Sequence, residues 1–225
     1  MNTDRQAPEL PTYTALKSLL EHSHPRLICT PASNLGTKER QHTVFIDHQV
    51  SPPLDAATLR QLRAQLGDLP HLLSFYEQYG SVRLFQDLKH TAHIGRASAY
   101  YIAPPEAWPE LHSFVEDWFS QLSEEEAKEF QPDWVSDYLA VGEIPNSGNY
   151  FLIPLVGKKR GWVFEFEHDG FEFIERGANF EEFVESLASV AHEHLERIGG
   201  HTRYTDGVTE AQWLAVAYEQ GNAGA

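Results

Sequence analysis

The sequence predicts an α+β fold in which a mixed or largely antiparallel sheet of about five to six strands is packed by helices. Residues 138–175 alternate short β-prone segments with turn residues, which is typical of an antiparallel meander. The segments before and after it carry apolar residues at helical spacing. With 225 residues, including 13 Phe, 9 Tyr and 5 Trp, the chain is large enough to bury a core without disulfides or metals.

The N-terminal part is predicted to form an extension that packs on the main domain. A helix is expected over residues 11–22, with Thr12 or Thr14 as its N-cap. Two β-prone stretches, residues 26–30 and 43–50, are expected to pair as a ribbon.

Between the N-terminal extension and the meander, four helices and two short strands are predicted. Proline in the first turn and glycine after the last turn delimit the helix from Leu69 to Gly80. Ser123 followed by Glu126 has the order of a capping box, so the glutamate run there predicts a short acidic helix. The helices are expected at residues 55–66, 69–80, 104–119 and 123–130, and the strands at residues 82–85 and 98–103.

The meander itself is predicted to contain four strands. Asp169 and Gly170 lie between alternating apolar residues, which favours a type I′ turn with positive φ at both positions. That turn places Glu167 opposite Glu172. The strands are expected at residues 138–144, 150–156, 162–168 and 171–175.

The C-terminal part is predicted to be helical. Asn179 is expected to cap one long helix over residues 179–198, which ends at Gly199 and Gly200. A last helix is expected to begin at Thr209 and to dock on the outside of the domain. The resulting division is an N-terminal extension of residues 1–53, a main domain of residues 54–198 and a C-terminal helix within residues 199–225.

Composition argues against several classes of function. The 17 basic and 33 acidic residues give a formal net charge of −16, which repels nucleic acids and anionic membrane surfaces. Cys29 is the single cysteine, so no intrachain disulfide and no four-cysteine zinc site can form. The first residues lack the pattern of a signal peptide, and the longest apolar run, residues 150–156, is too short to span a bilayer. We expect a soluble, cytoplasmic protein.

No motif predicts catalysis, a metal or a cofactor. His192 and His194 are two residues apart, whereas the helical zinc motif of metalloproteases needs two histidines four apart. His194 lies on the apolar stripe, which favours a structural role. The chain has no Gly-x-Ser-x-Gly elbow and no phosphate-binding glycine loop. We therefore predict no enzyme activity, no metal and no cofactor.

The predicted hairpin carries an unusual set of acidic residues. Glu167 opposes Glu172, with Glu165 beside them, and like charges facing each other destabilise a sheet. Solvent screening is one explanation, because repulsion between exposed charges is weak at physiological salt. A surface prepared for a basic partner is the other.

Four segments of the chain, residues 69–80, 141–153, 161–169 and 179–187, form a recognisable order of elements. Together they resemble the SUKH superfamily, whose bacterial members are mostly immunity proteins that neutralise toxins, often nucleases. The resemblance covers residues 54–198 and implies an α+β fold with a mixed or antiparallel sheet. Its matched residues are apolar, glycine and turn positions, so it assigns no catalytic or binding residue.

The resemblance and the charge both favour a protein that binds a basic toxin domain through an acidic surface. We expect a monomer with no nucleic-acid or membrane partner. A housekeeping scaffold or regulatory binding protein of the same fold is the alternative, and an enzyme is a third class. The candidate partner-binding residues are Glu124, Glu125, Glu126, Glu129, Asp133, Asp137, Glu165, Glu167 and Glu172, with Trp134 as the aromatic anchor.

Overall fold

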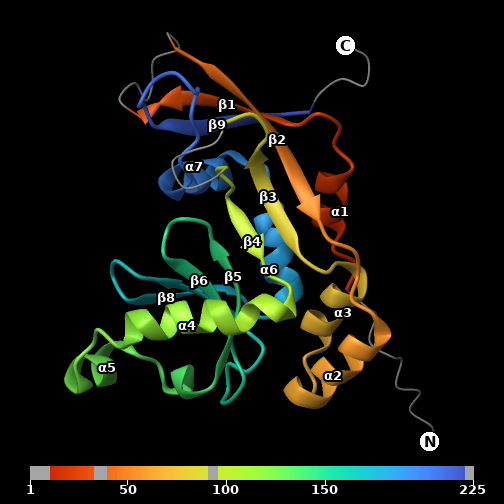
Figure 1. The fold of residues 1–225 in the computed structure, drawn as a ribbon, viewed down its shortest axis with the longest axis vertical. Coiled ribbons are helices and arrows are strands. Elements are labelled where there is room, and N and C mark those ends of the chain that lie inside the picture. The colour runs from red at the N-terminus through yellow and green to blue at the C-terminus, as the bar shows by residue number, and fades with distance from the viewer. Residues whose placement is uncertain (1–10, 33–39, 91–95, 221–225) are drawn as a thin grey trace, which may run out of the picture.

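The computed structural model describes residues 11–32, 40–90 and 96–220, and it has an α+β fold (Figure 1). The strands of this part of the chain are β1 (Arg26–Pro31), β2 (His42–Val50), β3 (Val82–Asp87), β4 (Tyr100–Ile102), β5 (Tyr138–Ile144), β6 (Asn149–Pro154), β7 (Val163–Glu167), β8 (Glu172–Gly177) and β9 (Trp213–Glu219). They form one nine-stranded sheet in the order β8-β7-β6-β5-β4-β3-β2-β1-β9. All neighbouring strands are antiparallel.

The antiparallel α+β prediction is confirmed, but the prediction of five to six strands is too low. β1 and β2 pair as the expected ribbon. β2 also pairs with β3, with Val50 opposite Val82, so the ribbon continues the sheet of the meander. β9 then adds to the free side of β1. Strands from all three predicted segments of the chain therefore belong to one sheet.

Helices cover both faces of the strands that form the meander (Figure 1). Phe119 packs on Phe166 of β7, at 5.1 Å between ring centroids, whereas Phe183 packs on Phe151 of β6 at 4.8 Å. In an antiparallel sheet, Phe151 points to the same face as its pair Glu165 and to the face opposite Phe166. The helices are α1 (Thr14–Leu20), α2 (Ala56–Leu66), α3 (Pro70–Gln78), α4 (Trp108–Phe119), α5 (Glu124–Phe130), α6 (Phe180–Leu187) and α7 (His192–His201), with short 3₁₀ turns η2 (Pro105–Ala107) and η3 (Asp133–Ser136).

The predicted C-terminal helix is wrong, because residues 213–219 form the edge strand β9. Trp213 and Ala215 are buried and Leu214 between them is half-buried, which is the alternation expected of a strand. Pairing with β1 places Ile28 opposite Ala217. The turn before the strand is held by Asp206, whose carboxylate accepts hydrogen bonds from the Val208 and Thr209 amides.

The long helix predicted over residues 179–198 is two helices. α6 ends at Leu187, and α7 begins at His192 after an extended Ala191. Val190, expected on a continuous apolar stripe, is 38% exposed. α7 continues through the glycines that were expected to end it and reaches His201. Gly199 lies against β9, where an added Cβ would meet Leu214 Cβ at 3.4 Å, an ordinary contact distance.

The meander has the expected strands and register, but its last turn differs from the prediction. Glu167 opposes Glu172 as expected. Phe171 occupies the left-handed region, with φ 50°, and neither Asp169 nor Gly170 has a positive φ. The side chain of Glu167 explains the difference, because its carboxylate accepts hydrogen bonds from both of these amides, at 3.2 and 2.8 Å.

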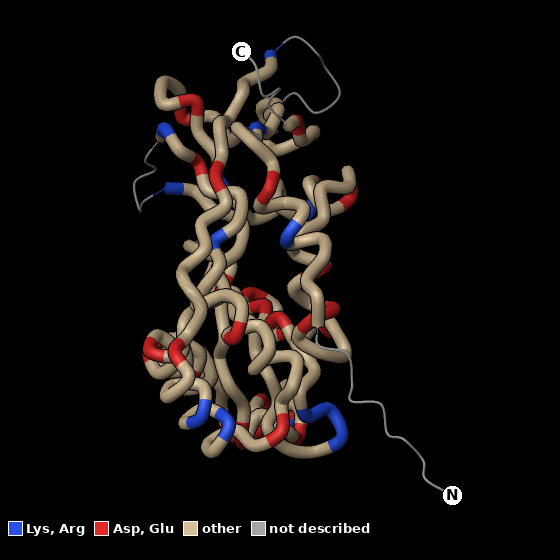
Figure 2. The backbone as a smooth tube through the Cα atoms, turned by 90° about the vertical axis from the view of Figure 1, so that its right-hand side faces the viewer, with Lys and Arg blue, Asp and Glu red and all other residues tan. Residues whose placement is uncertain are grey.

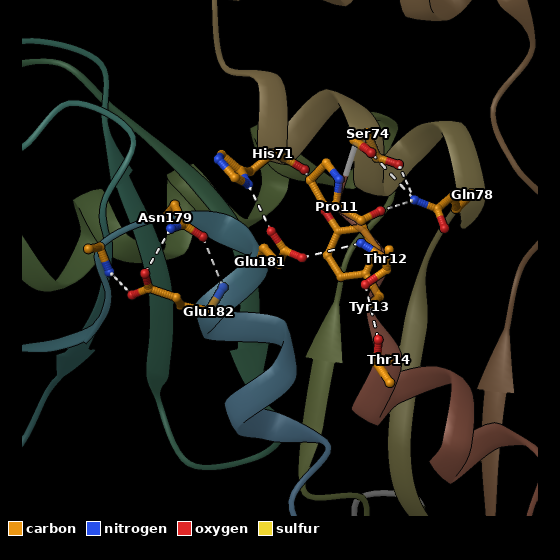
Figure 3. A network of polar contacts seen from close by, with 11 residues as sticks. Pro11, Thr12, Tyr13, Thr14, His71, Ser74, Gln78, Asn179, Glu181 and Glu182 are labelled. Carbon is orange, nitrogen blue, oxygen red and sulfur yellow. Dashed lines mark hydrogen bonds and ion pairs between the residues drawn. The ribbon is translucent and has the colours of Figure 1, made fainter. Parts of the chain in front are cut away.

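The N-terminal segment is fastened to α3 and α6 by polar contacts (Figure 3). The Thr12 amide donates to Glu181 Oε1 at 3.2 Å, and the Tyr13 hydroxyl donates to the His71 carbonyl at 2.6 Å. α1 does not use Thr12 or Thr14 as an N-cap, because Tyr13 holds that position in a left-handed conformation. The carboxylate of Glu185 on α6 instead accepts hydrogen bonds from the first amides of α1.

We expect Glu185→Ala to lower the free energy of unfolding by about 1–2 kcal/mol, which is the usual cost of losing a helix cap. The charged carboxylate satisfies amides at the positive end of the helix dipole, and no other side chain of the described residues caps α1. Urea denaturation checks the value. Glu196→Ala, an exposed change on α7, is the matched control and is expected to stay within 0.5 kcal/mol. An unchanged midpoint in Glu185→Ala would show that α1 does not depend on this carboxylate.

Candidate partner-binding surface

The acidic helix α5 projects beyond the end of α4 (Figure 1). Its start is the predicted capping box: the Glu126 amide donates to Ser123 Oγ, and the Ser123 amide donates to Glu126 Oε2 at 2.9 Å. These hydrogen bonds lower the pKa of Glu126. Glu126 thus stabilises the helix, and its negative charge also suits the N-terminal turn.

A groove of about 870 Å³, which we name the acidic groove, lies between α4, α5 and η3. Four of its side chains are acidic, and two, His112 and Lys128, are basic. The side chains and backbone that line it belong to His112, Glu116, Phe119, Glu124, Ala127, Lys128, Gln131, Pro132, Asp133, Val135, Ser136, Asp137 and Tyr138. An excess of carboxylates in a concave surface concentrates negative potential there.

Tyr138 connects the groove to the sheet. Its hydroxyl donates to Glu116 Oε1 at 2.7 Å, and its ring lies 4.8 Å from the ring of His112. Burial, and then the hydrogen bond and charge of Glu116, raise the pKa of Tyr138. The hydroxyl therefore stays protonated and holds Glu116 in a fixed position within the groove.

A second groove, of about 550 Å³, continues along the other end of α4 toward α2. It shares His112 and Tyr138 with the acidic groove, so the two grooves are adjacent. Its lining is mainly apolar and comes from Thr58, Gln61, Leu62, Gln65, Pro105, Glu106, Trp108, Pro109, His112, Tyr138, Leu139 and Ala140. The surface thus offers an acidic half and an apolar half side by side.

Three of the acidic candidate residues, Glu124, Asp133 and Asp137, line the acidic groove. Glu125 and Glu129 are exposed on α5 but are not among the residues that line it. The groove is lined by one face of α5 and its C-cap, which consists of Glu124, Ala127, Lys128 and Gln131. The structure therefore gathers three candidates, from a helix and from the segment that follows it, around one concave surface.

Trp134 is not available as a surface anchor. It is only 8% exposed, and its ring lies 4.8 Å from Phe164 and 5.4 Å from Phe173. The indole fills the core beneath the groove, because η3 turns it toward the sheet. Phe130, at the end of α5, is 44% exposed and is the aromatic side chain that this region presents to solvent.

The predicted acidic patch on the hairpin is wrong for Glu165. This residue is 5% exposed, and its carboxylate contacts Arg176 at 2.5 and 2.7 Å. Asn149 donates a further hydrogen bond to it at 3.0 Å. α6 covers this face of the sheet, so Glu165 is a buried, neutralised group and leaves the candidate surface.

The other two hairpin residues also differ from the expected patch. Glu167 is half-buried and holds the turn amides described above. Glu172 is exposed opposite it. The facing carboxylates thus have a local explanation, since one of them is a turn cap.

Sequence reasoning missed Glu116 and the apolar groove. Glu116 lies on α4, three residues before the end of the amphipathic helix, and nothing local distinguishes it from an ordinary solvent-facing residue. The apolar groove combines α2 with β5, which are more than 70 residues apart in sequence. Only the tertiary fold brings them together.

One group of described side chains could in principle hold a metal ion: Glu167, His168 and Asp169, whose ligand atoms lie within 4.8 Å of one another. Each already has a protein contact. His168 lies 3.0 Å from Asn149 Oδ1 and 3.1 Å from Asp169 Oδ1, and Glu167 accepts the turn amides. These contacts account for the arrangement, and we assign no metal.

The fold and its surface define an α+β protein with one antiparallel sheet and two adjacent grooves along α4, one acidic and one mainly apolar. No protein-family model matches the chain, and a search of curated proteins finds no relative. The resemblance to the SUKH superfamily therefore stays a prediction. In the portion of the chain that is described, no helix has both the length and the apolar character needed to cross a membrane.

Proposed function

We propose that this chain is a non-catalytic immunity protein that binds and neutralises a cognate bacterial toxin with a basic domain, such as a nuclease. The observation that carries the proposal is the acidic groove, with Glu116, Glu124, Asp133 and Asp137 around a concave surface. A nuclease must be basic where it holds phosphates, so an acidic surface attracts and blocks that site. The SUKH resemblance supports the same class.

The apolar groove supports a protein partner over a small charged ligand. Interface energy is concentrated in buried apolar and aromatic contacts, whereas a charged rim accelerates association. In the proposed complex, the acidic groove attracts the basic domain and the groove at α2 accepts an apolar side chain of the partner. The proposed place of action is the cytoplasm, where the buried free thiol of Cys29 stays reduced.

The alternative is a housekeeping scaffold that binds a cellular protein. The apolar groove of about 550 Å³ favours this class as much as it favours a toxin. The salt dependence of the association rate distinguishes these two classes. A charge-driven inhibitor is expected to lose association rate steeply as salt increases, and a scaffold that binds through an apolar groove is not.

The direct test uses the protein encoded by the adjacent gene in the source genome. A multidomain protein with a basic C-terminal domain would supply the partner, and co-expression with this chain is expected to restore growth and to give a stable complex. We expect the triple variant Glu124→Lys, Asp133→Lys and Asp137→Lys to lower the association rate at least tenfold at low salt, because it reverses the charge of the groove.

The matched control carries the same change in net charge on another surface: Glu193→Lys, Glu196→Lys and Glu210→Lys, three exposed positions. Its association rate is expected to remain within threefold of the wild type. Equal losses in both triples would show that net charge, rather than the acidic groove, drives binding. Absence of protection by the wild-type chain against the neighbouring domain would contradict the immunity proposal itself.

A further inference from the structure

A second polar site lies on the face of the sheet opposite α4, beneath α7. His194, Arg197 and His201 are three and four residues apart on this helix, so they share one face. The ring of Tyr100 on β4 lies 5.5 Å from the ring of His194 and 5.7 Å from that of His201. Helix and strand thus enclose three polar rings.

These rings carry buried atoms without hydrogen-bond partners. Tyr100 Oη, His194 Nε2 and His201 Nε2 are all inaccessible to solvent and accept or donate no hydrogen bond among the described residues. Tyr100 is 2% exposed and His194 is 5% exposed. A buried polar group without a partner costs about 1–3 kcal/mol, so three such groups on neighbouring rings indicate that something polar binds beside them.

The electrostatics of the site favour an anion. Burial, and after it the positive charges of Arg176, Arg203 and Arg197, lower the pKa of His201 to about 4. Burial and then Arg197 likewise lower the pKa of His194 to about 4. Three arginines therefore lie near two neutral imidazoles, in a chain whose net charge is −16.

One of these arginines is already paired, and two are not. Arg176 forms the ion pair with Glu165. Within the described ranges, no carboxylate lies at ion-pair distance from Arg197, and none from Arg203, whose guanidinium donates to the Gly200 carbonyl at 3.2 Å. Arg197 and Arg203 are exposed, so the unpaired positive charge lies at the surface of the protein. The site thus combines unpaired positive charge at the surface with buried polar atoms that have no partner among the described residues.

We propose that this arginine–histidine cluster, formed by Tyr100, Arg176, His194, Arg197, His201 and Arg203, binds a small oxyanion of the phosphate type. Guanidinium groups bind phosphate oxygens with paired hydrogen bonds. The hydroxyl of Tyr100 supplies a further donor, and His201 Nε2 supplies another in the tautomer whose Nδ1 accepts the hydrogen bond of the Thr202 hydroxyl. A metal cation fits poorly, because the arginines repel it. The proposal is independent of the partner that the acidic groove binds.

The oxyanion could be inorganic phosphate or the phosphate group of a nucleotide, and the experiment has an arm for each. Thermal unfolding is measured at pH 7 in 10 mM inorganic phosphate, in 10 mM adenosine monophosphate and in sodium chloride of equal ionic strength. A dissociation constant of about 1 mM predicts a rise in Tm of about 3–5 °C over the chloride sample. A rise with the nucleotide alone would assign the site to a phosphorylated small molecule.

Two variants locate the binding. Arg197→Gln changes an exposed side chain, so the variant is expected to fold, and it should lose at least half of the rise in Tm. Arg60→Gln, an exposed change on α2, is the matched control and should keep the full rise. In proton NMR, phosphate is expected to shift the ring signals of His194 and His201, the latter identified by its loss in His201→Gln.

Three outcomes would overturn the proposal. The first is an equal Tm in phosphate, nucleotide and chloride, with unmoved histidine signals, which would mean that water fills the cluster. The second is a full rise in Arg197→Gln. The third is an equal loss of the rise in Arg60→Gln, which would mean that phosphate acts on the protein without a specific site.

Discussion

Arg176→Met is expected to lower the free energy of unfolding by about 3–5 kcal/mol, because it leaves the Glu165 carboxylate buried without its counter-ion. The pair is well enclosed, with side-chain exposures of 19% for Arg176 and 6% for Glu165. Asn149 donates one hydrogen bond to the carboxylate, but an amide cannot neutralise its charge. The cost therefore comes mainly from an uncompensated buried charge.

A double-mutant cycle distinguishes this cause from a general loss of packing. Glu165→Gln combined with Arg176→Met removes both charges and keeps an oxygen that Asn149 can reach, so the double variant should be more stable than Arg176→Met alone. Lys159→Met is the matched control, because the Lys159–Glu175 pair is solvent-exposed and is expected to contribute less than 1 kcal/mol. Urea denaturation gives the free energy of unfolding of the wild type, Glu165→Gln, Arg176→Met, the double variant and Lys159→Met. A double variant as unstable as Arg176→Met would contradict the charge argument.

Glu165 also shows why the hairpin was expected to carry an exposed acidic patch. Alternation in a strand separates two faces, and in this hairpin it correctly places Glu165 and Phe166 on opposite ones. It does not reveal whether the polar face meets water. Here α6 packs on that face through Phe183. Arg176 lies two residues beyond Ile174, the residue that pairs with Glu165 on the neighbouring strand. This spacing could indicate a buried ion pair only once the register of the two strands was known.

Local signals predicted the elements that local chemistry determines. The capping box at Ser123, the proline at the start of α3 and the order of the meander strands all appear in the structure. Each depends on residues within a few positions of one another, so the sequence contains the whole cause.

Elements determined by distant partners were predicted less well. Trp213, Val216 and Ala217 fit a helical face, but their segment forms β9 because β1, almost 190 residues earlier, offers an open edge. α7 in turn packs against this strand, since Gly199 lies beside Leu214 of β9. Competition between helix and strand was therefore decided by a contact that the local pattern does not contain.

The candidate surface was predicted in composition rather than in shape. Glu124, Asp133 and Asp137 were expected to form an acidic patch, and they line one groove. Trp134 was chosen because it lies among them in sequence, but the 3₁₀ turn η3 points its indole into the core. Charge density is visible in a sequence, whereas the direction of a side chain in a short turn is not.

The stability of the folded chain is expected to fall steeply as the pH decreases from about 6.5 to 4.5. Burial is the main reason that the pKa values of His48, His194 and His201 are lowered to about 4. Histidine in an unfolded chain has a pKa of about 6.5, so the unfolded state binds more protons than the folded state between these values. The three neutral rings thus stabilise the fold fully above about pH 6.5, and this stabilisation is lost as the pH approaches 4.

Each histidine contributes up to about 1.4 kcal/mol per pH unit to the slope of the free energy of unfolding against pH. His48 and His201 are partly exposed, which reduces their share, so the total loss of stability by pH 4.5 is on the order of 5 kcal/mol. Burial of Glu143 raises the pKa of its carboxyl and acts in the opposite direction. Urea denaturation at pH 7.5, 6.5, 5.5 and 4.5 measures the slope.

His194→Gln is expected to reduce this slope by the contribution of about one proton, up to about 1.4 kcal/mol per pH unit, because it removes one of the three rings. His192→Gln is the control, since its ring is exposed on the same helix and should leave the slope unchanged. Constant stability from pH 7.5 to 5 in the wild type would mean that the buried rings do not stay neutral. If His194→Gln keeps the full slope while the wild type shows it, the titrating groups lie elsewhere in the fold.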